Sequence, residues 1–360
     1  LFDPSSIRTL GGKAFKVFTP FSKACLGGPT PSEPIAAPQN LQGIAGLPSD
    51  RLEDWKLVPQ TAKWTKGLAE CWVPSEGTGN TRLENFLDDA LDNYKAERDR
   101  PDLEGTSRLS PYLHFGQVSP HQVWYGVQGA AVAGGKNPQS VERYRLEILW
   151  REFSWHLLQQ FPQLHRKPLV AGFENFPWRE EPAGLMAWQK GMTGYPIVDA
   201  GMRQLWRTGW MHNRVRMVVA SFLVKHLLVD WREGEAWFWN TLVDADPGSN
   251  SASWQWVAGC GADAAPFFRI FNPILQGQKF DPEGSYVKRY VPELAGLAAA
   301  FIHEPWKAPA AILEQAGIKL GASYPRPIVD HNGARQRALA AFGALKEPRP
   351  SDQSTAYLFA

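Results

Sequence analysis

Apolar residues recur at intervals of three and four along most of the chain, which is the spacing of an amphipathic helix. The pattern predicts helices over 81–100, 121–131, 141–161, 183–191, 196–208, 211–229, 232–243 and 333–345. We find no run of alternating β-branched residues long enough for a sheet, and no internal repeat. The body of the chain is therefore predicted to be all-α.

The first 72 residues have a different composition, with eight prolines and seven glycines, most densely over 27–48. Such a stretch is typical of a loop or linker. We therefore divide the chain into a linker (1–72), a helical domain (73–345) and a C-terminal tail (346–360). Residues 20–50 are expected to be irregular surface chain.

Composition narrows the class of protein. With 44% hydrophobic and 21% charged residues in 360, the chain has enough apolar side chains for a packed core. The apolar stretch at 217–224, which includes Ser221, is too short to span a bilayer. Three widely spaced cysteines without a CxxC motif argue against a disulfide framework or a zinc site. We expect a cytoplasmic protein that binds no metal.

A local concentration of positive charge indicates a polyanion site, although the net charge of the whole chain is only +2. Between Arg203 and Arg232 there are six basic residues and one acidic residue. Aromatic side chains interleave with them: Trp206, Trp210, Phe222 and Trp231. Basic residues beside stacking platforms suit nucleic acid. The alternative is a solvated helix face over a core rich in tryptophan, since the chain has 16 tryptophans.

Two other groups of residues could hold a ligand. Thr106, Ser107 and Ser110 precede a predicted helix start, where hydroxyls and free backbone N–H groups suit a pyrophosphate. Glu147 and Trp150 share one face of the helix over 141–161, so a carboxylate and an indole could bind a flat heterocycle. The alternatives are a simple capped loop and an ordinary core tryptophan with a surface glutamate.

A short loop carries Asp244, Asp246 and Asn250, which could accept hydrogen bonds from a ring edge or pair with an arginine. Metal binding is less expected, because no third carboxylate or histidine lies at ligand spacing. Capping of the following helix is the alternative. Residues 259–264 match GxGxxA, but they follow a helical segment and not a strand, so they do not predict a dinucleotide-binding turn.

Taken together and in this order, the motifs resemble the photolyase/cryptochrome family, most closely its class I cyclobutane-dimer photolyases. The phrases that carry the resemblance are EGTSRLSPYLHFG, LEILWREF, WQKGMTGYPIVDAGMRQLWRTGWMHNRVRM, DWREGEAWFWNTLVDAD and NSASWQWVAGCGADAAPFFRIFNP. In addition, KVFTPFSKAC resembles the junction between the family's N-terminal α/β antenna domain and its helical flavin domain. The antenna domain itself is expected to be absent, which leaves any antenna chromophore unassigned.

The resemblance implies that FAD binds in a U shape inside the helical domain. The implied contacts with its phosphates and ribityl chain are Tyr94, Thr106, Ser107, Arg108, Leu109 and Ser110. Arg216 and Asp244 would form an ion pair beside the isoalloxazine. Asp246 would lie near the ring edge, and Asn250 would face flavin N5.

Three further sets of residues are implied by the same resemblance. The pocket that receives the DNA lesion would consist of Glu147, Trp150, Asn213, Met217 and Trp256. The contacts with DNA would come from Arg98, Arg214, Arg269 and Gln276. A relay of tryptophans from the flavin to the surface would consist of Trp254, Trp231 and Trp178.

The activity implied is light-driven repair of UV-damaged DNA by a monomer. A cyclobutane pyrimidine dimer stacks poorly, so extruding it from the duplex costs less than extruding normal bases. Excited FADH⁻ would donate an electron to the dimer, which splits and returns it. Glu147 would stabilise the dimer radical anion, and Trp150 and Trp256 would stack on the bases.

Three other functions remain open. A cryptochrome photoreceptor would share the fold, but plant cryptochromes typically carry Asp and animal ones Cys at the position of Asn250. A (6-4) photolyase is expected to carry histidines at the positions of Asn213 and Met217. A flavin-free DNA-binding module would be colourless when purified. The first two comparisons favour repair of cyclobutane dimers.

Overall fold

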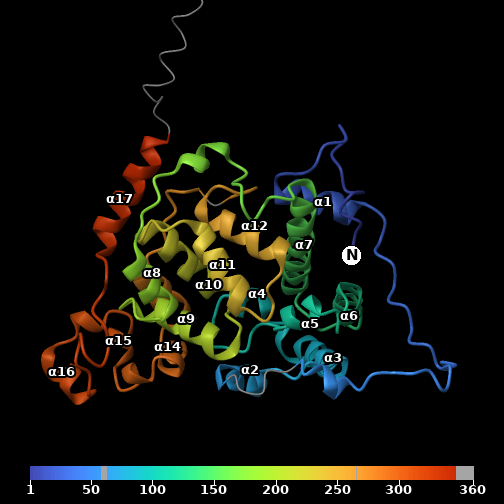
Figure 1. The fold of residues 1–360 in the computed structure, drawn as a ribbon, viewed down its shortest axis with the longest axis horizontal. Coiled ribbons are helices and arrows are strands. Elements are labelled where there is room, and N and C mark those ends of the chain that lie inside the picture. Colours follow the sequence, from blue (N-terminus) through green and yellow to red (C-terminus); the bar gives the residue numbers. More distant parts are fainter. Residues whose placement is uncertain (58–62, 265, 346–360) are drawn as a thin grey trace, which may run out of the picture.

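Helices make up the regular structure of the computed structural model, which describes residues 1–57, 63–264 and 266–345 (Figure 1). Within these ranges no residue lies in a β-strand, and the one isolated bridge joins Leu320 to Tyr324. The all-α prediction is therefore confirmed. Among the described helices, none is long and apolar enough to cross a membrane.

The N-terminal part corrects one prediction. Helix α1 (Phe18–Gly27) packs on α7 (Pro138–Gln160), and Phe21 and Cys25 are buried in the same apolar cluster as α7. Residues 20–27 are therefore not irregular surface chain, because apolar side chains spaced by three and four give this short helix one buried face. Residues 28–51 do run as exposed irregular chain, along the right-hand edge of Figure 1.

Four further helices share the apolar cluster of α7. They are α3 (Glu76–Asn85), α4 (Tyr94–Glu97), α5 (Ser110–His114) and α6 (Pro120–Val132), whereas α2 (Lys66–Cys71) contacts α9 (Pro196–Thr208). The predicted helix over 81–100 is interrupted by a π-helical turn (η3, Phe86–Ala90) and a break before α4. At this break Asp92 accepts hydrogen bonds from the Asn137 backbone N–H and the Ser140 hydroxyl, so the chain is fixed to the start of α7.

A second apolar cluster lies among α8 (Pro182–Gln189), α9 (Pro196–Thr208), α10 (Asn213–Ser221), α11 (Trp231–Thr241) and α12 (Pro247–Ala258). The predicted helix over 211–229 begins later, because the His212 ring accepts a hydrogen bond from the Arg214 N–H and caps α10. It ends earlier, in a π-helical turn (η5, Phe222–His226), before Leu228 takes a left-handed backbone conformation. Gly259 caps α12 with φ of 82°, which confirms that 259–264 is a helix end.

The C-terminal helices continue the second cluster. They are α13 (Pro273–Phe280), α14 (Ser285–Tyr290), α15 (Ala299–Ile302), α16 (Ala310–Gln315) and α17 (His331–Ala344). Short 3-10 turns complete the fold: η1 (Leu52–Trp55), η2 (Lys63–Thr65), η4 (Ala171–Asn175), η6 (Pro292–Leu294) and η7 (Pro305–Lys307).

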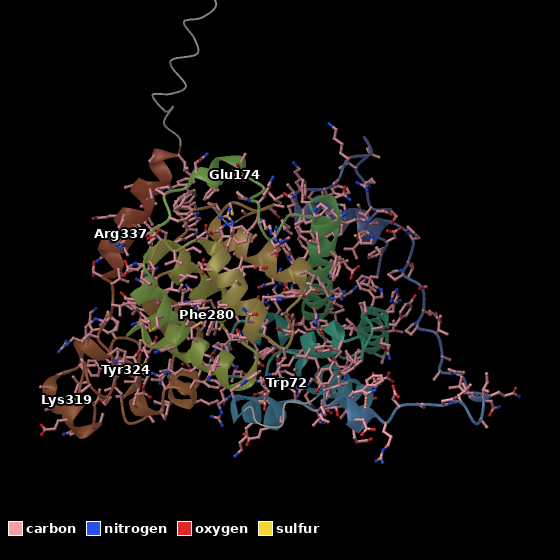
Figure 2. All side chains as sticks on the ribbon, in the orientation of Figure 1. Trp72, Glu174, Phe280, Lys319, Tyr324 and Arg337 are labelled. Atoms are coloured by element: carbon pink, nitrogen blue, oxygen red, sulfur yellow. The ribbon has the colours of Figure 1, made fainter. Side chains whose placement is uncertain are left out.

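The domain limits remain predictions. Residues 66–72 already pack on the helical body, since α2 contacts α9 and the Trp72 indole N–H donates to the Thr208 carbonyl at 2.7 Å. The predicted tail, 346–360, lies outside the described residues. Helices α7 and α12 are in close contact and join the two apolar clusters, and the side chains of both groups fill the space between the ribbons (Figure 2).

Candidate flavin and DNA site

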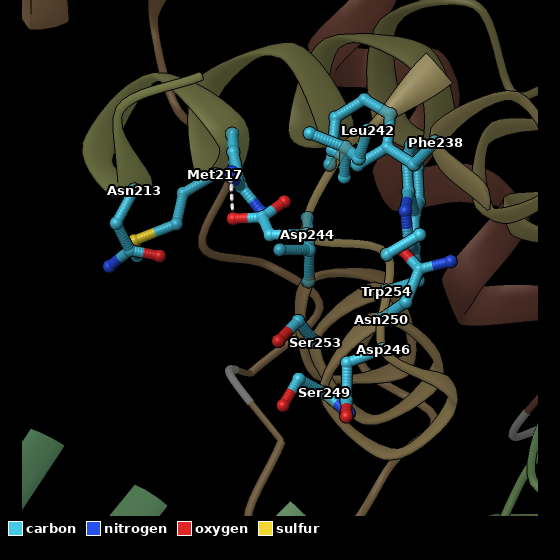
Figure 3. A pocket seen from close by; sticks show the side chains of 14 residues that line it. Asn213, Met217, Phe238, Leu242, Asp244, Asp246, Ser249, Asn250, Ser253 and Trp254 are labelled. Carbon is cyan, nitrogen blue, oxygen red and sulfur yellow. Dashed lines mark hydrogen bonds and ion pairs between the residues drawn. The ribbon is translucent and has the colours of Figure 1, made fainter. Parts of the chain in front are cut away.

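A cavity of about 180 Å³ opens between α10, α11 and α12 (Figure 3). Seven predicted site residues line it: Asn213, Arg216, Met217, Asp244, Asp246, Asn250 and Trp254. Its other lining residues are Ala220, Phe238, Leu242, Ala245, Ser249, Ser253 and Val257. The cavity therefore brings together residues that the sequence placed in three separate motifs.

The predicted ion pair is present at this cavity. Arg216 Nη2 donates to Asp244 Oδ2 at 2.8 Å, and Arg216 Nε donates to the Met211 carbonyl at 2.7 Å. The other carboxylate oxygen, Asp244 Oδ1, is buried without a hydrogen-bond partner among the described residues (Figure 3). Because a buried acceptor without a donor is costly, this atom marks a place for an N–H or O–H of a ligand.

The two neighbouring side chains are held by the protein itself. Asp246 caps α12, since Oδ1 accepts from the Ser249 N–H at 2.6 Å and Oδ2 accepts from the Trp155 indole at 3.1 Å. Capping, the alternative considered from the sequence, therefore applies to Asp246. Asn250 Nδ2 donates to the Glu235 carbonyl at 3.0 Å, which fixes the orientation of its amide at the cavity wall.

Sequence reasoning missed several lining residues that the geometry adds. Ser249, Ser253 and Val257 lie one turn apart on the face of α12 that carries Asn250 and Trp254. Their spacing of four is a signal that could have found them once Asn250 was chosen.

The predicted phosphate loop, residues 106–110, is hydrogen-bonded to the segment that precedes α10. Ser110 Oγ accepts a hydrogen bond from the Trp210 indole at 3.2 Å, and the Arg108 guanidinium lies over the same indole. Ser107 Oγ accepts from the Tyr144 hydroxyl at 2.9 Å. Leu109 is buried in the core, so any contact that it makes with a ligand comes from its backbone.

Tyr94 and Thr106, the remaining residues of the predicted phosphate and ribityl set, are placed differently. The Tyr94 ring is buried between α4 and α7, with the Arg98 guanidinium over it, and Thr106 is half-buried. Neither residue lines the cavity that contains Asp244, so their role stays a prediction.

The predicted lesion pocket is only partly assembled in one place. Asn213 and Met217 line the cavity side by side (Figure 3), whereas Glu147, Trp150 and Trp256 lie outside its lining. Trp150 stacks on Phe18, with ring centroids 3.7 Å apart and planes 7° apart. One face of this indole is therefore covered, and only the other is available to a base.

Charged residues from the end of α4, from α7 and from the start of α10 form a group of ion pairs that includes Arg214, the neighbour of the cavity residue Asn213. Glu147 is paired with Arg98 and, at 3.0 Å, with Arg143, while Arg214 is paired with Asp99 at 2.8 Å. We call these five residues the rim cluster.

The other two predicted DNA contacts take no part in the ion pairs of the rim cluster. Arg269 is exposed, and its carbonyl accepts a hydrogen bond from the buried Lys225 ammonium at 3.0 Å. Gln276 lies on α13, where its Oε1 is buried without a partner among the described residues.

Comparison with known proteins decides the family. Residues 144–344, more than half of the chain, match the model of the FAD binding domain of DNA photolyase. The chain belongs to the photolyase/cryptochrome family. A deoxyribodipyrimidine photo-lyase of Agrobacterium fabrum is 52% identical to it over 96% of this chain and 72% of that protein.

Two further relatives show the breadth of the photolyase/cryptochrome family. The crystal structure of a bacterial class III photolyase from Agrobacterium tumefaciens has a TM-score of 0.92 at 51% identity, over 96% of this chain and 72% of that one. Cryptochrome-1 of Arabidopsis thaliana is 40% identical over 96% of this chain and 52% of its own length. Because the solved relative is a class III enzyme, the assignment to class I stays a prediction.

FAD is the cofactor of this family domain, and the cavity fits part of it. The unpartnered Asp244 Oδ1 can accept from an N–H of a flavin ring, and Arg216 supplies a neighbouring positive charge. The apolar lining suits a flat aromatic ring.

The three tryptophans of the predicted relay differ in burial. Trp254 and Trp231 are buried, and Trp178 is half-buried. Gly234, one turn after Trp231, lets α11 approach the Trp254 indole, because any Cβ there would overlap that ring. The ring contacts of Trp254 are with Phe238 and Trp188, so an electron path through Trp231 and Trp178 stays a prediction.

Proposed function

We propose that this chain is a deoxyribodipyrimidine photo-lyase, an enzyme that uses light to split cyclobutane pyrimidine dimers in DNA. The observation that carries the proposal is the cavity, in which the Arg216–Asp244 ion pair and Asn250 lie beside Asn213 and Met217 within the FAD-binding domain. The photo-lyase of Agrobacterium fabrum supports the same activity at 52% identity.

When bound and reduced, FAD supplies the electron that opens the dimer after light absorption. The chain provides the surroundings. Arg216 and Asp244 form a fixed pair of charges at one side of the cavity, which needs no reorganisation during the reaction. Phe238, Leu242 and Trp254 line another part of the wall and keep water out.

Glu147 is proposed to act on the substrate. In the structure its carboxylate is held by Arg98 and Arg143. We propose that DNA phosphates take over the two arginines, and that the Glu147 carboxyl then reaches a pyrimidine carbonyl and stabilises the charge that develops on the dimer.

The remaining residues are proposed to recognise damaged DNA and to refill the flavin. Arg98, Arg214, Arg269 and Gln276 would contact the DNA backbone, and Trp254, Trp231 and Trp178 would carry electrons. Because neither Asn213 nor Met217 carries a titratable proton, the lining that they form favours a cyclobutane dimer over a (6-4) photoproduct. We further propose a monomer that works in the cytoplasm.

The direct test uses the FAD-loaded, chemically reduced protein and an oligonucleotide with a single cyclobutane thymine dimer. We expect intact thymines to be recovered under near-UV or blue light and not in the dark. Light-driven flavin changes without repair would instead indicate a cryptochrome photoreceptor. Repair of an oligonucleotide with a (6-4) photoproduct, and not of the dimer, would indicate the other photolyase specificity. Colourless protein would indicate a flavin-free DNA-binding module.

A further inference from the structure

Asp99, a member of the rim cluster, lies between two arginines that are proposed to bind DNA. Its Oδ2 accepts from Arg214 Nη2 at 2.8 Å, and its Oδ1 lies 3.7 Å from Arg98 Nε. Arg98 is the C-cap of α4, and Arg214 is the second residue of α10. The contact through Asp99 therefore joins two helices that are far apart in the sequence. One carboxylate is therefore shared by two guanidinium groups, and Glu147 holds Arg98 in addition.

Each guanidinium also lies over an aromatic ring. Arg98 lies over the Tyr94 ring at 5.5 Å, and Arg214 lies over the Phe280 ring at 4.5 Å (Figure 2 labels Phe280). Each arginine thus contacts both a ring and the Asp99 carboxylate, and only 12% and 19% of the two side chains are exposed. These contacts reduce the number of positions that either arginine can adopt.

Asp99 is charged at neutral pH. Burial raises the pKa of its carboxyl, but the hydrogen bond and charge of Arg214, together with the charge of Arg98, lower the pKa below its ordinary value overall. Without this negative charge, two neighbouring guanidinium groups would repel each other. They would then lose their fixed spacing.

We propose that Asp99 is a positioning residue for damaged DNA, holding Arg98 and Arg214 at the spacing of the phosphates that flank an extruded dimer. The inference rests on the proposed function. Extruding a dimer distorts the backbone on both sides of it, so the flanking phosphates differ in spacing from those of an undamaged duplex. Fixed arginines discriminate between the two backbones, whereas mobile arginines follow either.

For Asp99→Asn, the positioning role and simple electrostatics predict opposite changes in the affinity for dimer DNA. Asp99→Asn removes a negative charge beside the DNA, so electrostatics alone predicts tighter binding of any DNA. Loss of the fixed spacing predicts weaker binding of dimer DNA only. Because a hydrogen bond between two charged groups is stronger than one between neutral groups, we expect the affinity for dimer DNA to fall about tenfold. Affinity for undamaged DNA should stay equal or rise by up to about threefold.

The experiment measures the dissociation constants of FAD-loaded protein for two duplexes that differ only in one thymine dimer, in the dark and over a range of salt concentrations. Asp99→Glu keeps the charge and should recover most of the discrimination between the duplexes. Glu293→Gln is the matched control, because its pair with Arg203, at 2.7 Å, has similar burial and lies outside the site. This control should leave both constants unchanged.

Each outcome of this experiment either supports or overturns the positioning role of Asp99. A fall in dimer affinity for Asp99→Asn, with recovery in Asp99→Glu, supports the positioning role. Equal tightening on both duplexes, equal weakening on both, or no change would overturn it. If Asp99→Asn does not fold, Asp99→Ser, which also removes the charge, is measured in its place: loss of discrimination without loss of flavin supports the role, and full discrimination overturns it. A parent protein that binds both duplexes equally would instead contradict the proposed function, and this inference with it.

Discussion

The cavity and the rim cluster both contain ionised side chains, but the carboxylates of the two regions differ in their hydrogen-bond and ion-pair partners. In the cavity the Asp244 side chain is 2% exposed, and one of its carboxylate oxygens has no partner among the described residues. In the rim cluster both carboxylates are paired with arginines, and 25% of Glu147 and 32% of Asp99 remain exposed. The cavity thus has an unsatisfied acceptor for a resident ligand, whereas the rim can exchange its partners.

This difference indicates which region can tolerate a change. An ion pair beside a buried cavity cannot be rescued by water when one member is lost, so the remaining charge is left uncompensated. Rim charges can be rehydrated or can pair with phosphate, so their loss changes binding more than folding. The predictions below test this division, starting with the largest expected effect.

The largest effect is expected for Asp244→Ala. The variant leaves Arg216 without its counter-charge and removes the unpartnered oxygen that fits the flavin. We expect a loss of about 3 kcal/mol in the free energy of unfolding, as for other broken buried pairs, and a loss of bound FAD. Chemical denaturation and the ratio of visible to ultraviolet absorbance check the two results. Glu293→Gln breaks a more exposed pair and should retain FAD.

A smaller effect is expected for Gly234→Ala, which tests the packing behind the cavity. The added methyl group would overlap the Trp254 indole and the Leu223 side chain. We expect a destabilisation of about 1–3 kcal/mol, with a displaced Trp254 and slower photoreduction of oxidised flavin. Gly129→Ala on α6 is the control, because its methyl meets nothing within 4 Å and should stabilise the helix. Equal stability of the two variants would refute the close packing of α11 on Trp254.

The smallest effect on stability is expected for Trp178→Phe. Its indole N–H has no hydrogen-bond partner among the described residues, so the change loses mainly ring volume, at a cost of about 1 kcal/mol. If Trp178 ends an electron path, photoreduction of oxidised FAD with an external thiol should slow or stop. Chemically reduced protein should still repair dimers normally. Photoreduction at the parent rate would return Trp178 to a purely structural role.

Much of the fold could be predicted from the sequence where local signals agreed. Helix α9 matches its predicted bounds, because Pro196 opens it and Gly209 closes it in a left-handed conformation. The π-helical turn after α10 carries no such signal, since its apolar residues continue the helical pattern. In α1 the signal was present, but the surrounding prolines and glycines obscured it.

The candidate site likewise contains residues that a local motif could identify and residues whose role depends on contacts distant in the sequence. Asp244 and Asn250 could be chosen because they belong to a short motif that resembles the family. Asp99 could not, because its role arises from Arg214, which is distant in the sequence and meets it only in the folded chain. The cover of Phe18 over Trp150 likewise depends on packing between α1 and α7.

The measurement that tests the division most directly compares Glu147→Ala with Arg214→Ala. For each, the dissociation constant for dimer DNA and the number of dimers split per absorbed photon at saturating DNA are determined with reduced FAD in place. Glu147→Ala should lower the yield severalfold while binding stays within about threefold, because Arg98 and Arg143 become free for phosphate.

Arg214→Ala should do the reverse, weakening binding about tenfold, flattening its salt dependence and preserving the yield. Equal losses of binding and yield in both variants would contradict the account.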